Sequence, residues 1–152
     1  MFYNSIKDTY KNAKIPLAHI TLFKSIFENL TNKNMAKIFL AVYENTVIGG
    51  ILVLIYRETV YDYYAGSVRK YLHMCPNDLL TWYAIEWSCK KGFKIFDFGG
   101  AGQPNKPYGV RDFKKQFGGE LVNFGRFRLV HQPLKMQMAR LGFNIYQKLK
   151  IW

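Results

Sequence analysis

Cysteine and histidine are scarce in this sequence. The two cysteines, Cys75 and Cys89, stand far apart, without the close pairs that hold a zinc ion. We therefore expect free thiols in a reducing cytoplasm rather than a disulfide framework. The three histidines, His19, His73 and His131, are scattered and none lies near a cysteine or a cluster of carboxylates, so we expect no metal site.

Long apolar runs and several well-known catalytic motifs are also missing. No stretch is apolar for long enough to span a bilayer, and the sequence shows no signal peptide. It contains no Gly-x-Ser-x-Gly elbow and no Walker-type phosphate loop. These absences argue against covalent serine catalysis and nucleotide hydrolysis, and they predict a cytoplasmic protein.

Negative charge is in short supply, with 10 acidic residues against 22 lysines and arginines, which gives a formal net charge of +12. The excess is uneven, because residues 1–89 carry a net charge of +2 and residues 90–152 carry +10. A one-sided basic field predicts an acidic partner such as tRNA, a nucleotide-linked substrate or an anionic membrane surface. A lysine-rich surface that only faces water is the other interpretation.

What the chain does contain is enough apolar material for a substantial core. It has 152 residues, of which 49% are hydrophobic and 17% are aromatic, and this composition argues against disorder. A chain of this length is typical of one domain, so residues 1–152 are interpreted as a single unit.

The first half of the sequence predicts two helices followed by three antiparallel strands. Apolar residues recur at helical spacing over 2–10 and 20–30. Runs of β-forming residues predict strands over 37–43, 47–56 and 59–65. Two glycines within the second of these strands, Gly49 and Gly50, indicate a bulge or a close backbone contact.

The second half predicts helices alternating with strands. A helix follows Pro76, strands cover 94–98 and Leu121 to Val130, and a final basic amphipathic helix runs from Pro133 through Leu149. The apolar face expected for the helix after Pro76 consists of Leu79, Leu80, Tyr83 and Trp87. The final helix is expected to pack on the sheet, with contact to an anionic membrane as the alternative. The overall order is typical of an α/β (α+β) fold, a GNAT-like acyltransferase domain with a mixed central sheet and helices on both faces.

The stretch from Lys94 to Glu120 joins a strand, a loop rich in glycine and proline, and a short basic helix. Glycines let a backbone approach a ligand closely, and the start of a helix attracts anions. Two lysines, Lys114 and Lys115, follow beside aromatic residues that can fix the helix to a core. A positioned ammonium group is suited to stabilise the negative charge that develops during acyl transfer.

Four motifs occur together in one order: Tyr-Tyr-Ala-Gly-Ser at 63–67, Pro-Asn-Asp-Leu-Leu-Thr-Trp from 76, Phe-Asp-Phe-Gly-Gly at 96–100, and Phe-Lys-Lys-Gln-Phe-Gly-Gly at 113–119. In this order and spacing they resemble the second GNAT-like domain of the Fem family. Members of that family are aminoacyltransferases that carry amino acids from aminoacyl-tRNA to peptidoglycan precursors. The resemblance covers nearly the whole chain.

The resemblance implies a catalytic site at Lys114, Phe113 and Asp97. Lys114 would stabilise the oxyanion, Phe113 would pack the helix or stack near the reacting group, and Asp97 would orient the amine or hold the loop. Lys115 is the neighbouring candidate, because a helix presents only one of the two lysines to the cleft. The other expected substrate-binding residues are Tyr64, Gly66, Ser67, Arg69, Gly99, Gly100 and Tyr108.

The partners implied are aminoacylated tRNA as donor and a cell-wall precursor as acceptor, with no further cofactor. Fem enzymes have two such domains, so we expect either a first domain that is missing here or a homodimer that completes the cleft. An acyl-CoA-dependent GNAT N-acetyltransferase is the first alternative, although residues 67–75 lack the glycines that would cradle a pyrophosphate. A non-catalytic half-domain that binds RNA or membrane is the second, because Phe124 to Arg128 interleaves aromatic and basic residues.

Overall fold

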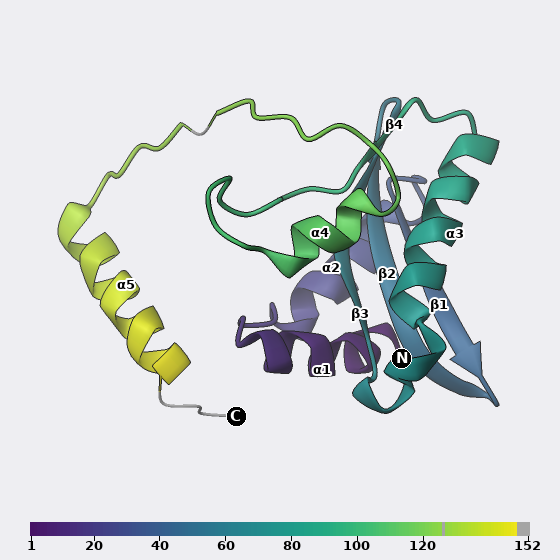
Figure 1. Ribbon diagram of the computed structural model, residues 1–152, viewed down its shortest axis with the longest axis horizontal. Coiled ribbons are helices and arrows are strands. Elements are labelled where there is room, and N and C mark those ends of the chain that lie inside the picture. The colour runs from purple at the N-terminus through teal and green to yellow at the C-terminus, as the bar shows by residue number, and fades with distance from the viewer. Residues whose placement is uncertain (126, 149–152) are drawn as a thin grey trace.

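A four-stranded mixed sheet is the centre of the computed structural model, which describes residues 1–125 and 127–148 (Figure 1). The strands are β1 (Ala36–Tyr43), β2 (Thr46–Tyr56), β3 (Thr59–Ser67) and β4 (Ile95–Asp97), and they lie in that order. The first three form the predicted antiparallel meander, whereas β4 pairs in parallel with the start of β3. Beyond Asp97 the chain leaves the sheet, and β3 continues without a partner on that edge.

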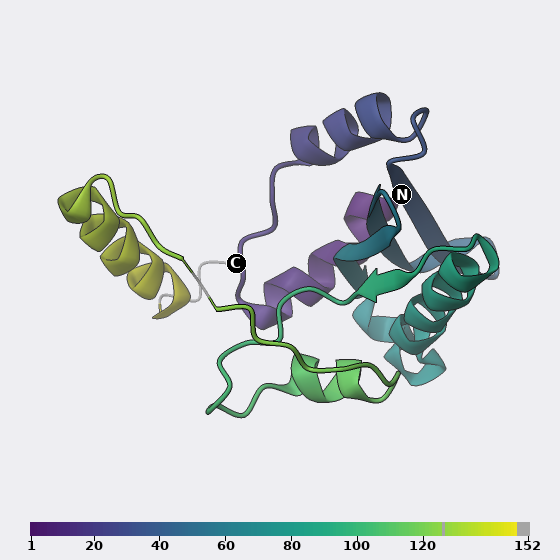
Figure 2. The same ribbon diagram turned by 90° about the horizontal axis from the view of Figure 1, so that it is seen from above.

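Helices cover both faces of the sheet, as the sequence predicts. Helices α1 (Phe2–Ala13) and α2 (Ile20–Leu30) lie on one face, and α3 (Pro76–Lys90) lies on the other (Figure 2). Each face has its own apolar cluster, one built around Ile6, Phe23 and Leu52 and the other around Ile51, Val53 and Val60. A short 3-10 helix, η1 (Arg69–Met74), connects β3 to α3, where the sequence predicted a loop.

The two glycines of β2 allow neighbouring elements to approach its backbone, which confirms the predicted close contact. The β1–β2 register shifts between Ala41 and Val42, so that β2 carries an extra residue beside Gly49. A Cβ atom on Gly50 would lie 2.6 Å from the Phe2 ring, and one on Gly49 would lie 3.1 Å from Leu80. The missing side chains therefore let α1 on one side and α3 on the other approach the backbone of β2 closely.

The buried face of α3 differs from the apolar stripe that the sequence predicted. Leu80 is buried, but Leu79 is 59% exposed and Tyr83 is 50% exposed. The helix instead turns small residues toward the sheet, with Thr81, Ala84 and Ser88 buried. Small side chains let the helix axis lie close to the strands. This close packing, rather than the number of large apolar residues on a face, decides which face of α3 is buried.

The remaining helices are α4 (Gly109–Lys115), which is shorter than predicted, and α5 (Pro133–Lys148). The predicted strand from Leu121 to Val130 is wrong, because residues 121–125 and 127–130 form no strand; residue 126 lies outside the described part. Alternation makes a strand only where a partner edge is available. Here the segment extends away from the sheet, and Phe124 is 87% exposed (Figure 1).

Helix α5 does not pack on the sheet, contrary to the expectation from its stripe. It lies apart from the other elements in both views, and none of its residues is buried (Figures 1 and 2). Its apolar residues face solvent, including Leu134 and Met138, which are 78% and 71% exposed. The predicted stripe residue Leu149 lies outside the described residues. No helix in the described ranges combines the length and the apolar character needed to cross a membrane.

Candidate active site

The site begins where β4 ends and the glycine loop starts. The Asp97 carboxylate accepts a hydrogen bond of 2.7 Å from the Gly99 backbone N–H, which closes a tight turn directly after the strand. Gly99 has a φ of 68°, and a Cβ atom there would lie 3.0 Å from the Tyr61 hydroxyl oxygen on β3. The turn therefore needs glycine both for its backbone conformation and for its close approach to β3. Asp97 holds the loop in this arrangement.

The Lys114 side chain turns back from α4 to this loop. Its ammonium group donates to the backbone oxygen of Phe98 and, at 2.9 Å, to that of Gly100. Lys115, the next residue, is exposed. Of the two lysines, the structure therefore brings Lys114 to the loop and leaves Lys115 at the surface.

Aromatic rings hold α4 against the end of β4. Phe113 contacts Phe117 with ring centroids 5.1 Å apart, and Phe117 contacts Phe98 at 6.1 Å. Phe98 in turn contacts Phe96 of β4 at 5.0 Å. These edge-to-face and tilted contacts fix the helix that carries Lys114. The sequence-based expectation that aromatic residues fix this helix is confirmed, and Phe113 lies in that packing.

The outer part of the loop is shaped by one arginine. The Arg111 guanidinium donates to the backbone oxygens of Gln103 at 2.9 Å and Lys106 at 2.7 Å, and more weakly to that of Ala101 at 3.4 Å. Tyr108 precedes α4, and its ring lies against Gly102, where a Cβ atom would be only 2.7 Å away. The loop is thus bound from α4 at two places, its inner part by Lys114 and its outer part by Arg111.

A second carboxylate, Asp62 of β3, belongs to the same cluster. Burial raises the pKa of Asp62 to about 6, the positive charge of Lys114 opposes this shift, and the negative charge of Asp97 adds to it. Burial lowers the pKa of the Lys114 ammonium, and both carboxylates oppose that shift. One lysine and two carboxylates therefore interact at the point where β4 separates from β3.

Tyrosines surround this charged cluster. Burial raises the pKa of Tyr61, and the negative charges of Asp97 and Asp62 raise it further. Burial also raises the pKa of Tyr10 on α1, with smaller increases from Tyr64 and Asp62. These phenols are neutral hydrogen-bond donors over the whole physiological range.

Four of the predicted substrate-binding residues lie farther along β3 and at the start of η1, against α1 and α2 rather than at the loop. Tyr64 packs on Phe23 with ring centroids 4.9 Å apart. The Ser67 backbone N–H donates to the Thr9 hydroxyl at 3.0 Å, and that hydroxyl donates back to the Ser67 backbone oxygen at 3.3 Å. The other two also contact α1, because a Cβ atom on Gly66 would meet Thr9 and the Arg69 guanidinium donates to Asn12.

Sequence reasoning missed Asp62, Tyr61, Tyr10 and Arg111. Asp62 carried a signal, because it is the single charged residue in the aromatic run Tyr61-Asp62-Tyr63-Tyr64 and a carboxylate there must be buried or face a cleft. The other three carried none. Their positions depend on the β3–β4 register, which places Tyr61 opposite Asp97, and on the docking of α1 and α4.

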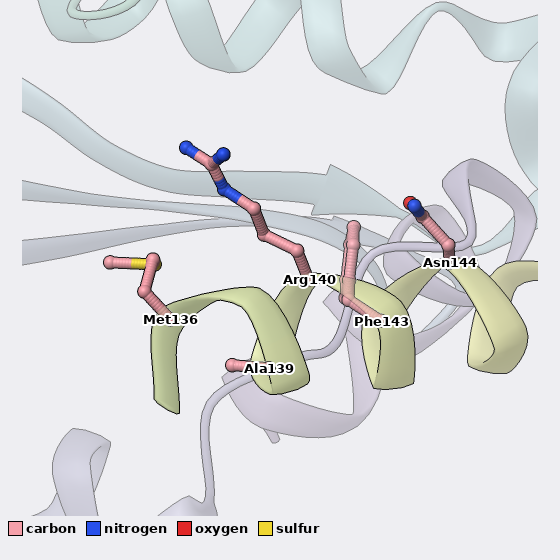
Figure 3. Close-up of a pocket in the computed structure, with 5 residues that line it drawn as sticks. All are labelled: Met136, Ala139, Arg140, Phe143 and Asn144. Carbon is pink, nitrogen blue, oxygen red and sulfur yellow. The ribbon is translucent and has the colours of Figure 1, made fainter. Parts of the chain in front are cut away.

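The arrangement offers an ammonium donor beside two carboxylates, which suits proton transfer and the stabilisation of an oxyanion. No group of three or more potential metal ligands occurs among residues 1–125 and 127–148. A hollow along α5 is lined by Met136, Ala139, Arg140, Phe143 and Asn144, all from that helix, and none of these belongs to the cluster around Lys114 (Figure 3).

Known structures with a similar fold include acyltransferases. An aminoglycoside acetyltransferase from an uncultured soil metagenomic sample, in complex with sisomicin, is 19% identical and has a TM-score of 0.51. The match covers 73% of this chain and 86% of that chain. A transcriptional regulator from Bacillus halodurans C-125 is 14% identical with a TM-score of 0.54, over 78% of this chain and 79% of that one. None of the curated proteins matches the chain at a significant level.

These likenesses define the class by its fold, which is that of the GNAT acetyltransferases. The model of the FemAB family matches residues 21–142, which is most of the chain, and the chain therefore belongs to the FemAB family. The matched segment includes the β3–β4 edge, the glycine loop and Lys114. Family and fold together support an acyltransferase.

Proposed function

We propose that this protein transfers an aminoacyl group from aminoacyl-tRNA to an amine, and that the amine belongs to a peptidoglycan precursor. The observation that carries the proposal is the position of Lys114. An ammonium group has three N–H donors, and two of them bind the backbone oxygens of Phe98 and Gly100. Within the described part of the chain no acceptor takes the third. That donor would stabilise the oxyanion formed when the amine attacks the ester carbonyl.

The distribution of charge supports tRNA as the donor. Residues 90–152, which include the loop and Lys114, carry a net charge of +10. Exposed basic residues such as Lys106 and Lys115 lie beside the site and would meet the phosphates near the acylated end of the tRNA. The ester is already activated, so the reaction needs no further cofactor. Aminoacyl-tRNA and cell-wall precursors would place the protein in the cytoplasm, at the inner face of the membrane.

An acyl-CoA donor is the alternative, and the acetyltransferase among the similar structures keeps it open at the level of fold. Two observations weigh against it. The segment after β3 lacks the glycines that would let backbone N–H groups surround a pyrophosphate. The Arg69 guanidinium, which would meet a phosphate there, donates to Asn12 of α1 at 3.0 Å.

The decisive experiment compares Lys114→Ala with Lys115→Ala in transfer of labelled amino acids from charged tRNA to a nucleotide-linked muropeptide with a free lysine amine. Loss of the oxyanion donor should lower the rate of Lys114→Ala by ~10²-fold or more. At saturating tRNA, Lys115→Ala should retain most of the rate, because its exposed side chain makes no hydrogen bond to the loop within the described residues. Equal rates for the two variants would contradict the role of Lys114.

Titrations of the intact protein with aminoacyl-tRNA and with acetyl-CoA complete the test. Saturable binding of tRNA at moderate salt is the expected result. Preferential binding of acetyl-CoA would favour the alternative, and binding of neither would indicate that a first domain or a second copy is required. The predicted contacts with a membrane, a homodimer partner or a first domain stay predictions.

A further inference from the structure

Helix α5 exposes a stripe of large apolar side chains that the described part of the chain leaves uncovered. The stripe consists of residues at positions i, i+4, i+7 and i+11, which share one face of a helix: Leu134, Met138, Leu141 and Ile145. Each of the four is more than half exposed. No residue of α5 is buried, and the helix lies apart from the sheet in both views (Figures 1 and 2). A continuous apolar face of this kind is typical of an interaction surface.

Positive charge borders the stripe. Lys135 precedes Met138 by three residues and Lys148 follows Ile145 by three, so each lysine is a neighbour of the stripe on the helix surface. Both lysines are exposed. A third cation, Arg140, lies on another face of the helix (Figure 3). Long lysine side chains can lie along apolar surface while their ammonium groups stay among polar groups, so α5 combines an apolar face with cationic edges.

The segment that contains α5 has no acidic residue to balance these charges. Residues 121–152 hold six lysines and arginines and no aspartate or glutamate, which gives a net charge of +6, half of the +12 of the chain. Lysines elsewhere pair with carboxylates, as Lys90 does with Glu86 and Lys94 with Glu58. Among the described residues no carboxylate pairs with a cation of α5. A partner that suits this helix is therefore anionic as well as apolar.

Charge and side-chain chemistry together select the partner. A second copy that paired its α5 with this one would bring the same positive charge, so the two segments would repel each other. A nucleic acid supplies phosphates, but its bases stack on aromatic rings, and the stripe consists of aliphatic side chains. The surface of an anionic bilayer offers both components, with negative head groups above and hydrocarbon at the depth that an amphipathic helix reaches.

We propose that α5 is a membrane-docking helix that lies in the plane of an anionic bilayer. Its apolar stripe enters the boundary of the hydrocarbon, and Lys135 and Lys148 contact the head groups. The helix lies on the bilayer and does not cross it, because no helix in the described ranges is long and apolar enough to do so. Docking is reversible and weakens as salt rises. The inference goes beyond aminoacyl transfer and does not depend on it.

Flotation of the full chain with lipid vesicles tests the proposal. The native protein should bind vesicles of phosphatidylcholine and phosphatidylglycerol in about equal parts at least ~10-fold more tightly than vesicles of phosphatidylcholine alone. Met138→Gln/Leu141→Gln should weaken binding to the mixed vesicles by ~10-fold or more, because glutamine keeps the helix propensity but removes the apolar area. Leu72→Gln/Leu79→Gln, which changes two exposed leucines outside α5, is the matched control and should bind like the native protein.

A second pair of variants separates α5 from the general charge of the protein. Lys135→Gln/Lys148→Gln should weaken binding to the mixed vesicles by ~10-fold or more and leave binding to phosphatidylcholine alone unchanged. Lys24→Gln/Lys33→Gln removes the same charge from exposed positions in the first half of the chain and should retain native binding. An equal loss in both pairs would show that any positive charge attracts the protein to lipid, and the assignment of α5 would be wrong.

Two further results would overturn the proposal. The first is a native protein that does not bind the mixed vesicles, and the second is undiminished binding by Met138→Gln/Leu141→Gln. If vesicle binding is absent and sedimentation shows a dimer that this variant dissociates, a second copy covers the stripe. If the variant loses tRNA binding instead, tRNA covers it. A protein that binds vesicles but transfers nothing would keep its docking helix while the proposed function fails, and transfer without vesicle binding would give the reverse.

Discussion

The two adjacent lysines of α4 have different surroundings. The Lys114 side chain binds the backbone oxygens of Phe98 and Gly100, whereas Lys115 is exposed to solvent. Two N–H donors of Lys114 bind the glycine loop, and the proposed function assigns the third to the oxyanion. The proposed role and the structural one are therefore linked, because any change that removes the ammonium group also releases the loop.

Asp62 makes stability depend on pH in a direction opposite to that of most carboxylates. Its pKa is raised from 3.8 to about 6, so between these values the folded protein binds more protons than the unfolded chain. Stability contributed at this site therefore falls as the pH rises through that window. At pH 7.5 the ionised side chain destabilises the fold by about 1–3 kcal/mol.

We expect Asp62→Asn to remove this penalty. Its free energy of unfolding should exceed that of the native protein by about 1–3 kcal/mol at pH 7.5, and the excess should fall by more than half at pH 4.5. Urea titrations of both proteins at the two pH values measure the difference. Asp112→Asn should follow the native protein at both, since its carboxylate is exposed. An excess that does not change with pH would show that the surroundings of Asp62 do not raise its pKa.

Local sequence identifies residues whose role depends on their own segment. Asp97 and Gly99 could be predicted because they lie within one strand-to-loop turn, and the position of Lys114 followed from a motif. Asp62 stood out only as the single charge in an aromatic run, and its neighbours could not be predicted because β4, α1 and α4 are distant from it in sequence. The choice between Lys114 and Lys115 also required the rotation of α4, which the packing of Phe113 and Phe117 determines.

At the scale of the element, α3 shows why apolar count does not decide which face of a helix is buried. The sequence predicted that a stripe of large residues is buried, but the helix buries Leu80 together with the small residues Ala84 and Ser88. Gly49 leaves room for Leu80 on the sheet side, with 3.1 Å between a hypothetical Cβ atom and the leucine. Contacts across elements, which no single segment encodes, set the rotation of the helix.

Adjacent leucines on α3 test this rotation. Leu80→Ala should lower the free energy of unfolding by about 2–4 kcal/mol, because a side chain that is 4% exposed would leave a cavity. Leu79→Ala, at a position that is 59% exposed, should change it by less than about 0.5 kcal/mol. Thermal or chemical unfolding of the two variants measures both. A larger loss for Leu79→Ala would support the stripe predicted from the sequence.

The predicted strand over 121–130 failed for a related reason. Its alternation of apolar and polar residues is real, but β4 pairs over only three residues and the chain moves away from the sheet after Glu120. A strand forms only when a second segment pairs with it, so the apolar and polar pattern of one segment alone cannot establish a strand. The meander of β1, β2 and β3 could be predicted because short turns place its partners next to each other.

At the scale of the whole molecule, the uneven charge predicts how salt acts on tRNA binding. Contacts with phosphates release bound counterions, so the affinity for tRNA should fall by ~10-fold or more between 50 and 200 mM salt. The double variant Lys106→Gln/Lys115→Gln should reduce the slope of log K against log salt by about 1–2. The matched pair Lys24→Gln/Lys33→Gln, exposed on the other half of the chain, should leave the slope unchanged. Equal effects of the two pairs would argue against a defined basic surface.

The contacts of α1 have a consequence for how the chain folds during synthesis. Phe2 fills the space above Gly50, and Thr9 exchanges hydrogen bonds with Ser67, which is 58 residues away. This helix is synthesised before β2 and β3, yet its docking surface does not exist until those two strands have emerged and paired. Its apolar side chains therefore remain exposed to solvent until the meander has formed. The order of translation and the order of assembly are reversed at this end of the chain, so a pause in synthesis before Ser67 would leave α1 accessible to chaperones.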